Sequence, residues 1–421
     1  MLFNLCLISG IMFMSGVSTS IITSFYPSDA LLRGVSISRS GIVISALYII
    51  TMVFSLLFSR FIPVFGSRML FIFGSFTFGF GNLVFGILDK VEDGVLFFTL
   101  SLFFRVLIGL GDSAAVPASY NLAKKEVSPN NRGKTLTMLE FWFGVGSALG
   151  PSIGGYLYDA GGFSLPFILT GISTLVTSFV YLISQTESEG QSEDSMKSSS
   201  ISSSEYVSVT PAVVSLMFAT AAQWWYAPTL APFLKSTHNF TASQTGLILL
   251  MRGLTYTVTA PCVGLLADIG IHNHTVILLG NSLIAAAYTL IAPIPQLIPM
   301  LGTQIWVTTM AVGVQGVGYA SVCNGALLHL TEKVGLIGSS IWLAVVCFGI
   351  VVGSTLGSFA SEEVGFQAAS AIFLCCLIGQ IIFFTMFLVA GRVCVSTRSS
   401  EAGSEEIKKP LLISGSNSLI E

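Results

Sequence analysis

The sequence predicts an all-α membrane protein with twelve transmembrane helices in two pseudo-symmetric six-helix bundles. Three observations support this prediction. Of the 421 residues, 53% are hydrophobic and 9% are charged, against about 25% charged residues in an average soluble domain. Twelve apolar stretches are each long enough to cross a bilayer core of about 30 Å. A glycine pattern in the first half of the chain returns in the second half, which indicates two related halves.

The first six predicted spans follow one another with short loops between them. The first span begins almost at Met1, and its apolar run is longer than the core of a signal peptide, so we expect a membrane helix there. Its many serines indicate that part of it faces other helices or a polar cavity. The six spans are Asn4–Pro27, Ser40–Ile62, Met69–Leu88, Val95–Ala118, Thr135–Leu157 and Phe163–Ile183.

A serine-rich and acidic segment, 185–210, separates the two halves. It has too little apolar surface to fold alone, so we expect a cytosolic linker between an N-terminal bundle, 1–184, and a C-terminal bundle, 211–393. The polar segment 394–421 is predicted to be a disordered cytosolic tail. The C-terminal spans are Pro211–Leu234, Gln244–Ala267, Thr275–Ile294, Met300–Leu330, Ile337–Ala360 and Ala368–Val393.

Basic residues predict that both termini are cytosolic. With this orientation most lysines and arginines of the loops, Lys124 and Lys125 among them, face the cytosol, as the positive-inside rule requires. The opposite side collects acidic residues. The glycosylation signal at Asn239 then faces the lumen or the outside, where modification is expected, whereas a second signal at Asn273 faces the cytosol.

A ladder of small residues marks the fifth predicted span. Small residues four apart on an apolar helix let a second helix backbone approach closely. The proline within this ladder frees a backbone carbonyl and kinks the helix, so we expect close packing and flexing there. A related ladder in the eleventh span has serines in place of the proline and the last glycine. The residues are Gly146, Gly150, Pro151, Gly154 and Gly155, and then Gly349, Gly353 and Gly357.

These motifs resemble the major facilitator superfamily. Its proton antiporters carry a fifth-helix motif that Gly146 to Gly155 matches, with Thr137 in place of its first glycine. A loop signature after the second helix of each half is matched by Gly264 and Asp268, and in part by Gly66 and Arg68. The conserved arginine of the fourth helix in that superfamily is matched by Arg105. The resemblance implies that the glycine ladders flex as a central site changes sides.

Within that superfamily the chain resembles the vesicular amine transporters, and most closely the vesicular polyamine transporter branch. The resemblance implies proton-coupled antiport of small organic cations, amines or polyamines, into an acidic vesicular compartment. One departure is Ala227, which stands where polyamine-like members have an acid, and the first span lacks the acid of monoamine members. One alternative function is transport of an organic anion or a neutral metabolite. A second alternative is a transport-inactive sensor or scaffold, because the first-half loop signature is degraded. The matching segments are 85–94, 139–167, 227–234, 263–268 and 353–359, the last followed by Gly365 and Phe366.

Ionisable residues inside the predicted spans are candidates for proton and substrate coupling, because charges at membrane depth are costly and are mostly functional. The four candidates are Glu140, Asp112, Arg105 and Arg252. Arg105 and Asp112 lie on one helix face, where Arg105 either takes part in transport or anchors helices by pairing with a carboxylate.

Glu140 is the strongest candidate for the coupling residue. Removal from water favours a neutral carboxylic acid over a carboxylate, so Glu140 could exchange a proton for a cationic substrate. The alternative is a salt bridge from Glu140 to Arg105 or Arg252. Arg252 by itself repels an amine, and a cross-half pair between Glu140 and Arg252 would remove that repulsion.

Three aromatic residues in the middle of the seventh span, Trp224, Trp225 and Tyr226, are candidates for substrate binding. Aromatic faces attract cations, whereas packing is the alternative role. The histidines at 238, 272, 274 and 329 lack metal-site spacing and are interpreted as surface residues.

The sequence shows no phosphate-binding loop and no set of acid, base and nucleophile, so we predict a non-enzyme without cofactor or metal, driven by an ion gradient. The net charge of −3 argues against nucleic acid. We expect a monomer whose partners are a small-molecule substrate, protons and the lipid bilayer.

The tail contains a pair of leucines, Leu411 and Leu412, after acidic residues. This pattern resembles an acidic dileucine sorting signal. It predicts an integral multi-pass protein of a vesicular, endosomal or lysosomal membrane, with the plasma membrane as the alternative.

Overall fold

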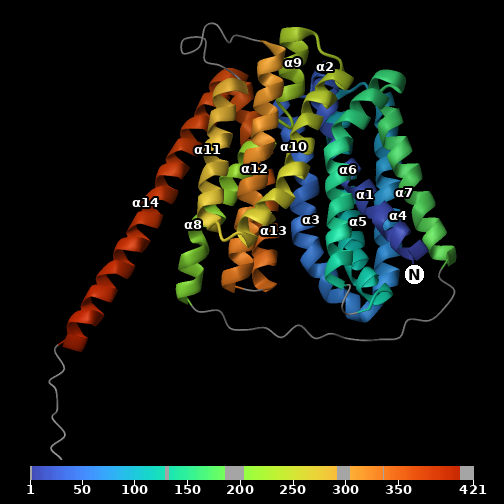
Figure 1. The fold of residues 1–421 in the computed structure, drawn as a ribbon. Coiled ribbons are helices and arrows are strands. Elements are labelled where there is room, and N and C mark those ends of the chain that lie inside the picture. The colour runs from blue at the N-terminus through green and yellow to red at the C-terminus, as the bar shows by residue number, and fades with distance from the viewer. Residues whose placement is uncertain (1, 129–131, 185–202, 292–303, 335, 408–421) are drawn as a thin grey trace, which may run out of the picture.

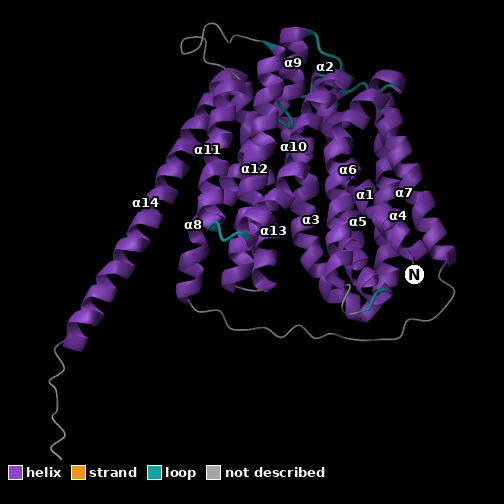
Figure 2. Cartoon of the chain, viewed as in Figure 1, coloured by secondary structure: helices purple, strands orange, loops and turns teal. Residues whose placement is uncertain are grey.

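The computed structural model describes residues 2–128, 132–184, 203–291, 304–334 and 336–407, and within these ranges every regular element is a helix (Figures 1 and 2). The N-terminal half contains α1 (Leu2–Ile21), η1 (Ile22–Ser24), α2 (Tyr26–Leu32), α3 (Ile37–Phe65), α4 (Ser67–Ile87), η2 (Leu88–Lys90), α5 (Gly94–Glu126), α6 (Arg132–Gly161) and α7 (Ser164–Ser184). The C-terminal half contains α8 (Ser203–Trp224), α9 (Leu230–His238), α10 (Ala242–Asp268), α11 (Asn273–Ile291), α12 (Ile305–Val334), α13 (Leu336–Val364) and α14 (Phe366–Ile407).

The described helices reproduce the predicted architecture of two six-helix bundles. Ten of the described helical stretches are long and apolar enough to cross a membrane. The other two members are α6 and the helix formed by α8 and α9. A turn at Trp225–Thr229 separates α8 from α9. In the same way, Phe25 interrupts the helical path from α1 through η1 to α2. Each half therefore opens with a broken helix.

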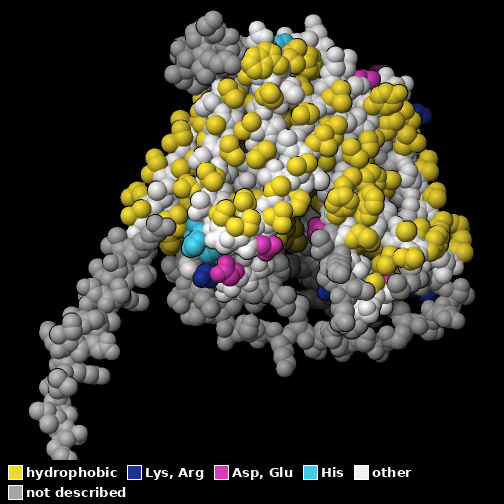
Figure 3. All heavy atoms as spheres, viewed as in Figure 1, with side chains coloured by type: hydrophobic (Ala, Val, Ile, Leu, Met, Phe, Trp, Pro, Cys, Tyr) yellow, Lys and Arg dark blue, Asp and Glu magenta, His cyan; other side chains and the backbone are white. Residues whose placement is uncertain are grey.

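Apolar side chains cover the outer face of the bundle. Figure 3 shows hydrophobic side chains spread over the height of the helices on the face in view, with charged side chains near its two ends. Phe73, Phe76 and Met386 are each more than half exposed. Large apolar side chains in water would be unfavourable at this density, so this surface is suited to lipid.

The two ends of the bundle differ in what they carry. One end, upper in Figure 1, carries the short helices α2 and α9, and we call it the α2–α9 end. The other end, where α1 begins and toward which α14 extends, is called the terminal end. Both described chain ends therefore lie on one side, as an even number of spans requires. Which side of a membrane that is stays a prediction.

The loop glycine Gly66 has a backbone reason for its identity. It joins α3 directly to α4 with φ of 79°, in the left-handed region where a Cβ is unfavourable. In the second half, Asp268 ends α10, and the left-handed position is taken by Gly270 with φ of 91°. In both halves a glycine with positive φ therefore lets the chain reverse direction at the terminal end. In the first half this glycine is the motif residue Gly66, whereas in the second half it lies two residues after the motif residue Asp268.

The glycine ladders bring helices into backbone contact within each half. A Cβ at Gly146 would lie 2.2 Å from the carbonyl oxygen of Phe13 on α1. A Cβ at Gly353 would lie 2.2 Å from the carbonyl oxygen of Ala221 on α8. The ladder helices α6 and α13 thus pack on the first helix of their own half in the same way, which is the geometry that an internal repeat produces.

Some helix limits differ from the predicted spans. α14 continues to Ile407, where a disordered tail was expected after Val393, and α8 begins at Ser203 within the expected linker. The remaining linker residues 185–202, and the leucines Leu411 and Leu412, lie outside the described residues. The proposed limits of the linker and tail therefore stay predictions.

Candidate functional site

The two halves meet along two pairs of helices, α6 with α10 and α3 with α13. On the first pair, a Cβ at Gly155 would lie 2.1 Å from the carbonyl oxygen of Ala242. On the second pair, a Cβ at Gly41 would lie 2.5 Å from the carbonyl oxygen of Ser354. α2 also packs on α9. These contacts close the route between the halves at the α2–α9 end.

Two acidic residues fasten this closed end. The carboxylate of Asp159, in the last turn of α6, accepts a 2.9 Å hydrogen bond from the backbone N–H of Ser243 in the first turn of α10. The hydroxyl of Ser243 donates to the same oxygen. The carboxylate of Glu362, in the last turn of α13, accepts a 2.9 Å hydrogen bond from the backbone N–H of Ser38 in the first turn of α3. Each acid therefore crosses from one half to the other.

The physical basis of this fastening is the helix N-terminus. The first N–H groups of a helix have no partner within that helix, and the aligned peptide dipoles place partial positive charge there. An acid from the other half supplies both an acceptor and a negative charge. We call the two contacts, Asp159–Ser243 and Glu362–Ser38, the paired latch. In the sequence these acids are visible only as an excess of negative charge on one side of the predicted membrane topology. The overlooked signal was a serine in the second position of both α3 and α10.

We expect removal of the paired latch to open the α2–α9 end. In the double variant Asp159→Asn with Glu362→Gln, the loss of two charge–helix contacts weakens closure by about 1–2 kcal/mol, which changes the ratio of closed to open molecules roughly 5- to 30-fold. Spin labels at the exposed Leu32 on α2 and Lys235 on α9 would report the change as a longer distance population. Glu363→Gln is the matched control, and an unchanged distance distribution in the double variant would contradict the expectation.

The predicted aromatic residues of the seventh span separate into different roles. Trp224 contacts Tyr48 of the other half edge-to-face, with ring centroids 5.1 Å apart. Trp225 instead lies in the core of the C-terminal half, stacked on Phe366 and Phe373 at 5.1 and 5.2 Å. Trp225 is therefore a packing residue, whereas Trp224 stands between the halves.

Arg252 lies beside two of these rings. Its guanidinium carbon is 5.9 Å from the centroid of Trp224 and 5.7 Å from that of Tyr226. One guanidinium nitrogen donates to the carbonyl oxygen of Gln223 at 3.2 Å. The arginine is 7% exposed. A buried cation between aromatic faces is a suitable partner for an acidic group of a ligand.

Glu140 lies on α6 and is exposed. Its carboxylate accepts a hydrogen bond from the hydroxyl of Tyr120 on α5. Two ion pairs of the described residues join Arg33 to Asp29 and to Asp89, and Glu140 takes part in neither. The predicted salt bridge of Glu140 to Arg252 or Arg105 is therefore absent from this structure. A tyrosine on the neighbouring helix satisfies the acid instead.

Asp112 and Arg105 are both buried on α5, as their shared helix face predicted. The hydroxyl of Ser15 on α1 donates to Asp112. Arg105 makes no ion pair with a described carboxylate, and none of its three guanidinium nitrogens has a hydrogen-bond partner in the described ranges. The expected anchoring pair between Arg105 and a carboxylate is therefore absent from this structure.

The histidines were interpreted as surface residues, and this is wrong for His329. Its side chain is 4% exposed, and its ring centroid lies 4.4 Å from that of His274. The cause is the length of α12, which continues to Val334 and so places His329 inside the bundle instead of at a helix end. The glycosylation candidate Asn239 is exposed after α9, with φ of 54°, at the α2–α9 end.

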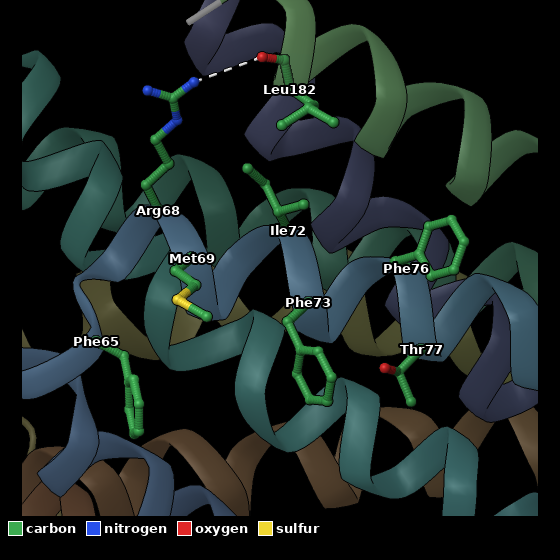
Figure 4. A pocket seen from close by; sticks show the side chains of 8 residues that line it. All are labelled: Phe65, Arg68, Met69, Ile72, Phe73, Phe76, Thr77 and Leu182. Atoms are coloured by element: carbon green, nitrogen blue, oxygen red, sulfur yellow. Dashed lines mark hydrogen bonds between the residues drawn. The ribbon is translucent and has the colours of Figure 1, made fainter. Parts of the chain in front are cut away.

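A pocket of about 570 Å³ lies on the outside of the N-terminal half (Figure 4). Its lining residues from α4, Met69, Phe73 and Phe76, are each about 60% exposed. Arg68 of the loop motif stands at one end, with a long 3.5 Å contact to the carbonyl oxygen of Leu182 on α7. This groove faces away from the junction of the halves, so it is not the central site.

Comparison with known proteins places these features in a family. The sequence profile of the Major Facilitator Superfamily matches residues 8–219 and 212–417. The human MFS-type transporter SLC18B1 is 28% identical over 368 residues, which cover 84% of this chain and 79% of the human protein. The rat MFS-type transporter SLC18B1 is 26% identical over 372 residues, with the same coverage.

Solved structures show the same fold. A bacterial homolog of the human lysosomal transporter Spinster, in an inward-facing and occupied conformation, superposes with a TM-score of 0.71. The alignment covers 92% of this chain and 96% of the bacterial one, at 12% sequence identity. A second structure, in an inward-facing and unoccupied conformation, gives a TM-score of 0.66.

Proposed function

The chain belongs to the Major Facilitator Superfamily, and from that premise we propose that it is a proton-coupled antiporter of small organic cations, amines or polyamines. Membership indicates a membrane transporter rather than an enzyme. The proposed mechanism is alternating access, in which the halves rock about one central site and expose it to each side in turn. The paired latch supports this mechanism, because its contacts can be broken and remade as rigid halves move.

The observation that carries the proposal is the environment of Glu140. This carboxylate lies on a helix that borders the junction of the halves, and its described partner is the neutral hydroxyl of Tyr120. An acid without a fixed counter-charge is free to take up a proton in one state and attract a cation in another. Asp112, held by the hydroxyl of Ser15, offers a second acid of the same kind.

The aromatic rings at the junction support a cationic cargo. Trp224 and Tyr48 meet across the halves, and aromatic faces bind ammonium groups when both are removed from water. We propose that a cargo amine lies near these rings while one of its charges is balanced by Glu140.

A second candidate function is transport of an organic anion, and Arg252 is the observation that favours it. Arg252 is a buried guanidinium between two rings, and it donates to the carbonyl oxygen of Gln223 without an ion pair to a described acid. Arg252→Gln separates the candidates. For an anionic cargo, loss of a charge-assisted bond should raise KM about tenfold or more. For an amine, removal of the repelling charge should leave KM unchanged or lower it.

The decisive experiment is uptake into proteoliposomes with an imposed pH gradient. The cargo panel should contain spermidine, a monoamine and an organic anion. Accumulation of a cation that stops when the gradient is collapsed supports the proposal. Accumulation of only the anion supports the second candidate. Absence of all uptake, together with an intact fold, would instead favour the transport-inactive sensor or scaffold.

We also propose that the protein resides in a vesicular, endosomal or lysosomal membrane as a monomer, with cytosolic termini. The dileucine signal is the basis for this location. The double variant Leu411→Ala with Leu412→Ala should move the protein to the plasma membrane. Treatment with a glycosidase should increase the electrophoretic mobility of the glycosylated protein. If the Asn239→Gln variant does not show this change, Asn239 carries the carbohydrate and the α2–α9 end faces the lumen.

A further inference from the structure

We propose that the N-terminal half contains a buried binding site for a small inorganic anion, with chloride as its representative, centred on Arg105. The site lies within one bundle, among α2, α3 and α5, and it adjoins the junction between the halves at Tyr48. It requires neither the proposed cargo nor the proposed proton coupling.

The first observation is an uncompensated cation. The side chain of Arg105 is 0% exposed, and its three guanidinium nitrogens have no hydrogen-bond partner within the described ranges. Burial of a charge is costly unless a counter-charge and hydrogen bonds accompany it. The acid nearest in sequence on the same helix is Asp112, two turns away, and its carboxylate is held by Ser15. The described residues thus leave Arg105 without an acceptor.

Aromatic rings do not replace the missing acceptor. Cation–π contacts in the described part of the chain involve Arg33, Arg39 and Arg252, and none involves Arg105. The titratable groups that interact electrostatically with Arg105 are Tyr48 on α3, Tyr26 on α2 and Asp112. Two of these three are neutral hydroxyls. The compensation of a full positive charge is therefore incomplete.

The second observation is a pair of buried hydroxyl groups near the arginine. The hydroxyls of Tyr26 and Ser101 are buried next to each other, and no other described residue is a hydrogen-bond partner for either. Ser101 precedes Arg105 by one helical turn on α5, and Tyr26 interacts electrostatically with Arg105. Buried polar groups in native proteins nearly always have partners. A guanidinium with two hydroxyls presents N–H and O–H donors together, and an anion accepts from all of them.

The size of the ligand follows from the burial of its neighbours. Tyr26, Ser101 and Arg105 are each 0% exposed, and Tyr48 is 8% exposed. Tyr26 is further enclosed by Phe97, with ring centroids 5.8 Å apart. An organic cargo does not fit in so closed a region, whereas a monatomic anion needs only the space of about one water molecule. The proposed ligand is therefore a halide and not the carboxylate of a transported metabolite.

Thermal unfolding of the purified protein in chloride and in gluconate, at equal ionic strength and pH, tests the proposal. A ligand that binds only the folded state raises Tm, with saturation as its concentration exceeds Kd. We expect this rise in the wild-type protein and its loss in Arg105→Gln. Tyr26→Phe and Ser101→Ala each remove one hydroxyl and should weaken the apparent affinity for chloride about tenfold. These two variants decide the matter if Arg105→Gln does not fold.

Arg39→Gln is the matched control. It removes an exposed arginine whose guanidinium carbon lies 5.7 Å from the ring centroid of Phe98, so the response of Tm to chloride should remain. A crystal grown in bromide should show an anomalous peak beside the guanidinium of Arg105. A wild-type Tm that is equal in chloride and gluconate would overturn the proposal, as would an undiminished response in the Arg105, Tyr26 and Ser101 variants. These readouts do not involve transport, so a failed uptake experiment leaves them unaffected.

Discussion

Replacement of Gly146 by leucine is expected to abolish folded protein, whereas replacement of Gly144 by leucine, two residues earlier on α6, is expected to leave it intact. A Cβ at Gly146 would lie 2.2 Å from the backbone carbonyl oxygen of Phe13, and 3.0 Å from the backbone nitrogen of Val17. Backbone atoms of α1 cannot rotate away as a side chain can, so the two helices would have to separate. At Gly144, nothing lies within 4 Å of the added atom.

The magnitude of this effect follows from overpacking. Extra methylene groups in a packed core cost typically about 1–3 kcal/mol, and more where the backbone must shift. Because the backbone must shift here, we expect Gly146→Leu to lower the free energy of unfolding by about 3 kcal/mol or more. Such a loss should reduce the yield of monodisperse protein from membranes at least about tenfold. Size-exclusion chromatography of a fluorescent fusion measures this yield. Equal yields of the Gly146→Leu and Gly144→Leu variants would show that α6 and α1 are not in backbone contact.

The internal repeat supplies an independent copy of this experiment. Gly353→Leu on α13 should fail in the same way, because its Cβ would lie 2.2 Å from the carbonyl oxygen of Ala221 on α8. Gly379→Leu, on α14 with nothing within 4 Å, is its control. Failure of one ladder variant and tolerance of the other would mean that the halves do not share the same packing.

Replacement of Glu140 by glutamine is expected to abolish accumulation of cargo against its gradient while exchange of cargo across the membrane continues. Glutamine keeps the size and hydrogen-bonding ability of the acid, but it cannot carry a proton on and off. One proton per cargo molecule makes each pH unit worth about 1.4 kcal/mol, which is a tenfold concentration ratio. The variant should therefore lose about a tenfold accumulation per pH unit, with folded yield unchanged.

Two proteoliposome measurements separate coupling from binding. The first is uptake under a pH gradient, and the second is exchange of labelled for unlabelled cargo without a gradient. Tyr120→Phe removes the described partner of Glu140 and should alter the pH dependence of uptake without abolishing it. Glu92→Gln, on an exposed loop, is the control for loss of a carboxylate. Gradient-driven accumulation that persists in Glu140→Gln would exclude this residue as the proton carrier.

The candidate site was only partly accessible from the sequence. The positions of Arg105 and Asp112 on a buried face of one helix followed from their spacing, because helical periodicity is a local property. Their partners did not follow, since Ser15 lies 97 residues from Asp112 and belongs to another helix. The same limit explains why the pairing of Glu140 with Arg252 is not seen in this structure: the hydroxyl of Tyr120, on the neighbouring helix, is the partner of the acid instead.

Adjacent residues in the sequence also took unlike roles that periodicity alone did not separate. Trp224 faces the other half, whereas Trp225 is stacked inside its own. The turn that interrupts the helix after Trp224 changes the direction of successive side chains. Position on a regular helix wheel therefore fails as a guide at a broken helix.

The sequence by itself determined the membrane class, the two related halves and the helices that pack closely, because apolar length and small-residue spacing are physical requirements of a bilayer-spanning helix. The tertiary structure alone decided which charges find partners. Asp159 meets the first turn of α10 and Glu362 that of α3, while Arg105 meets no acceptor in the described chain. These outcomes depend on how whole helices approach each other, and such contacts join residues far apart in sequence.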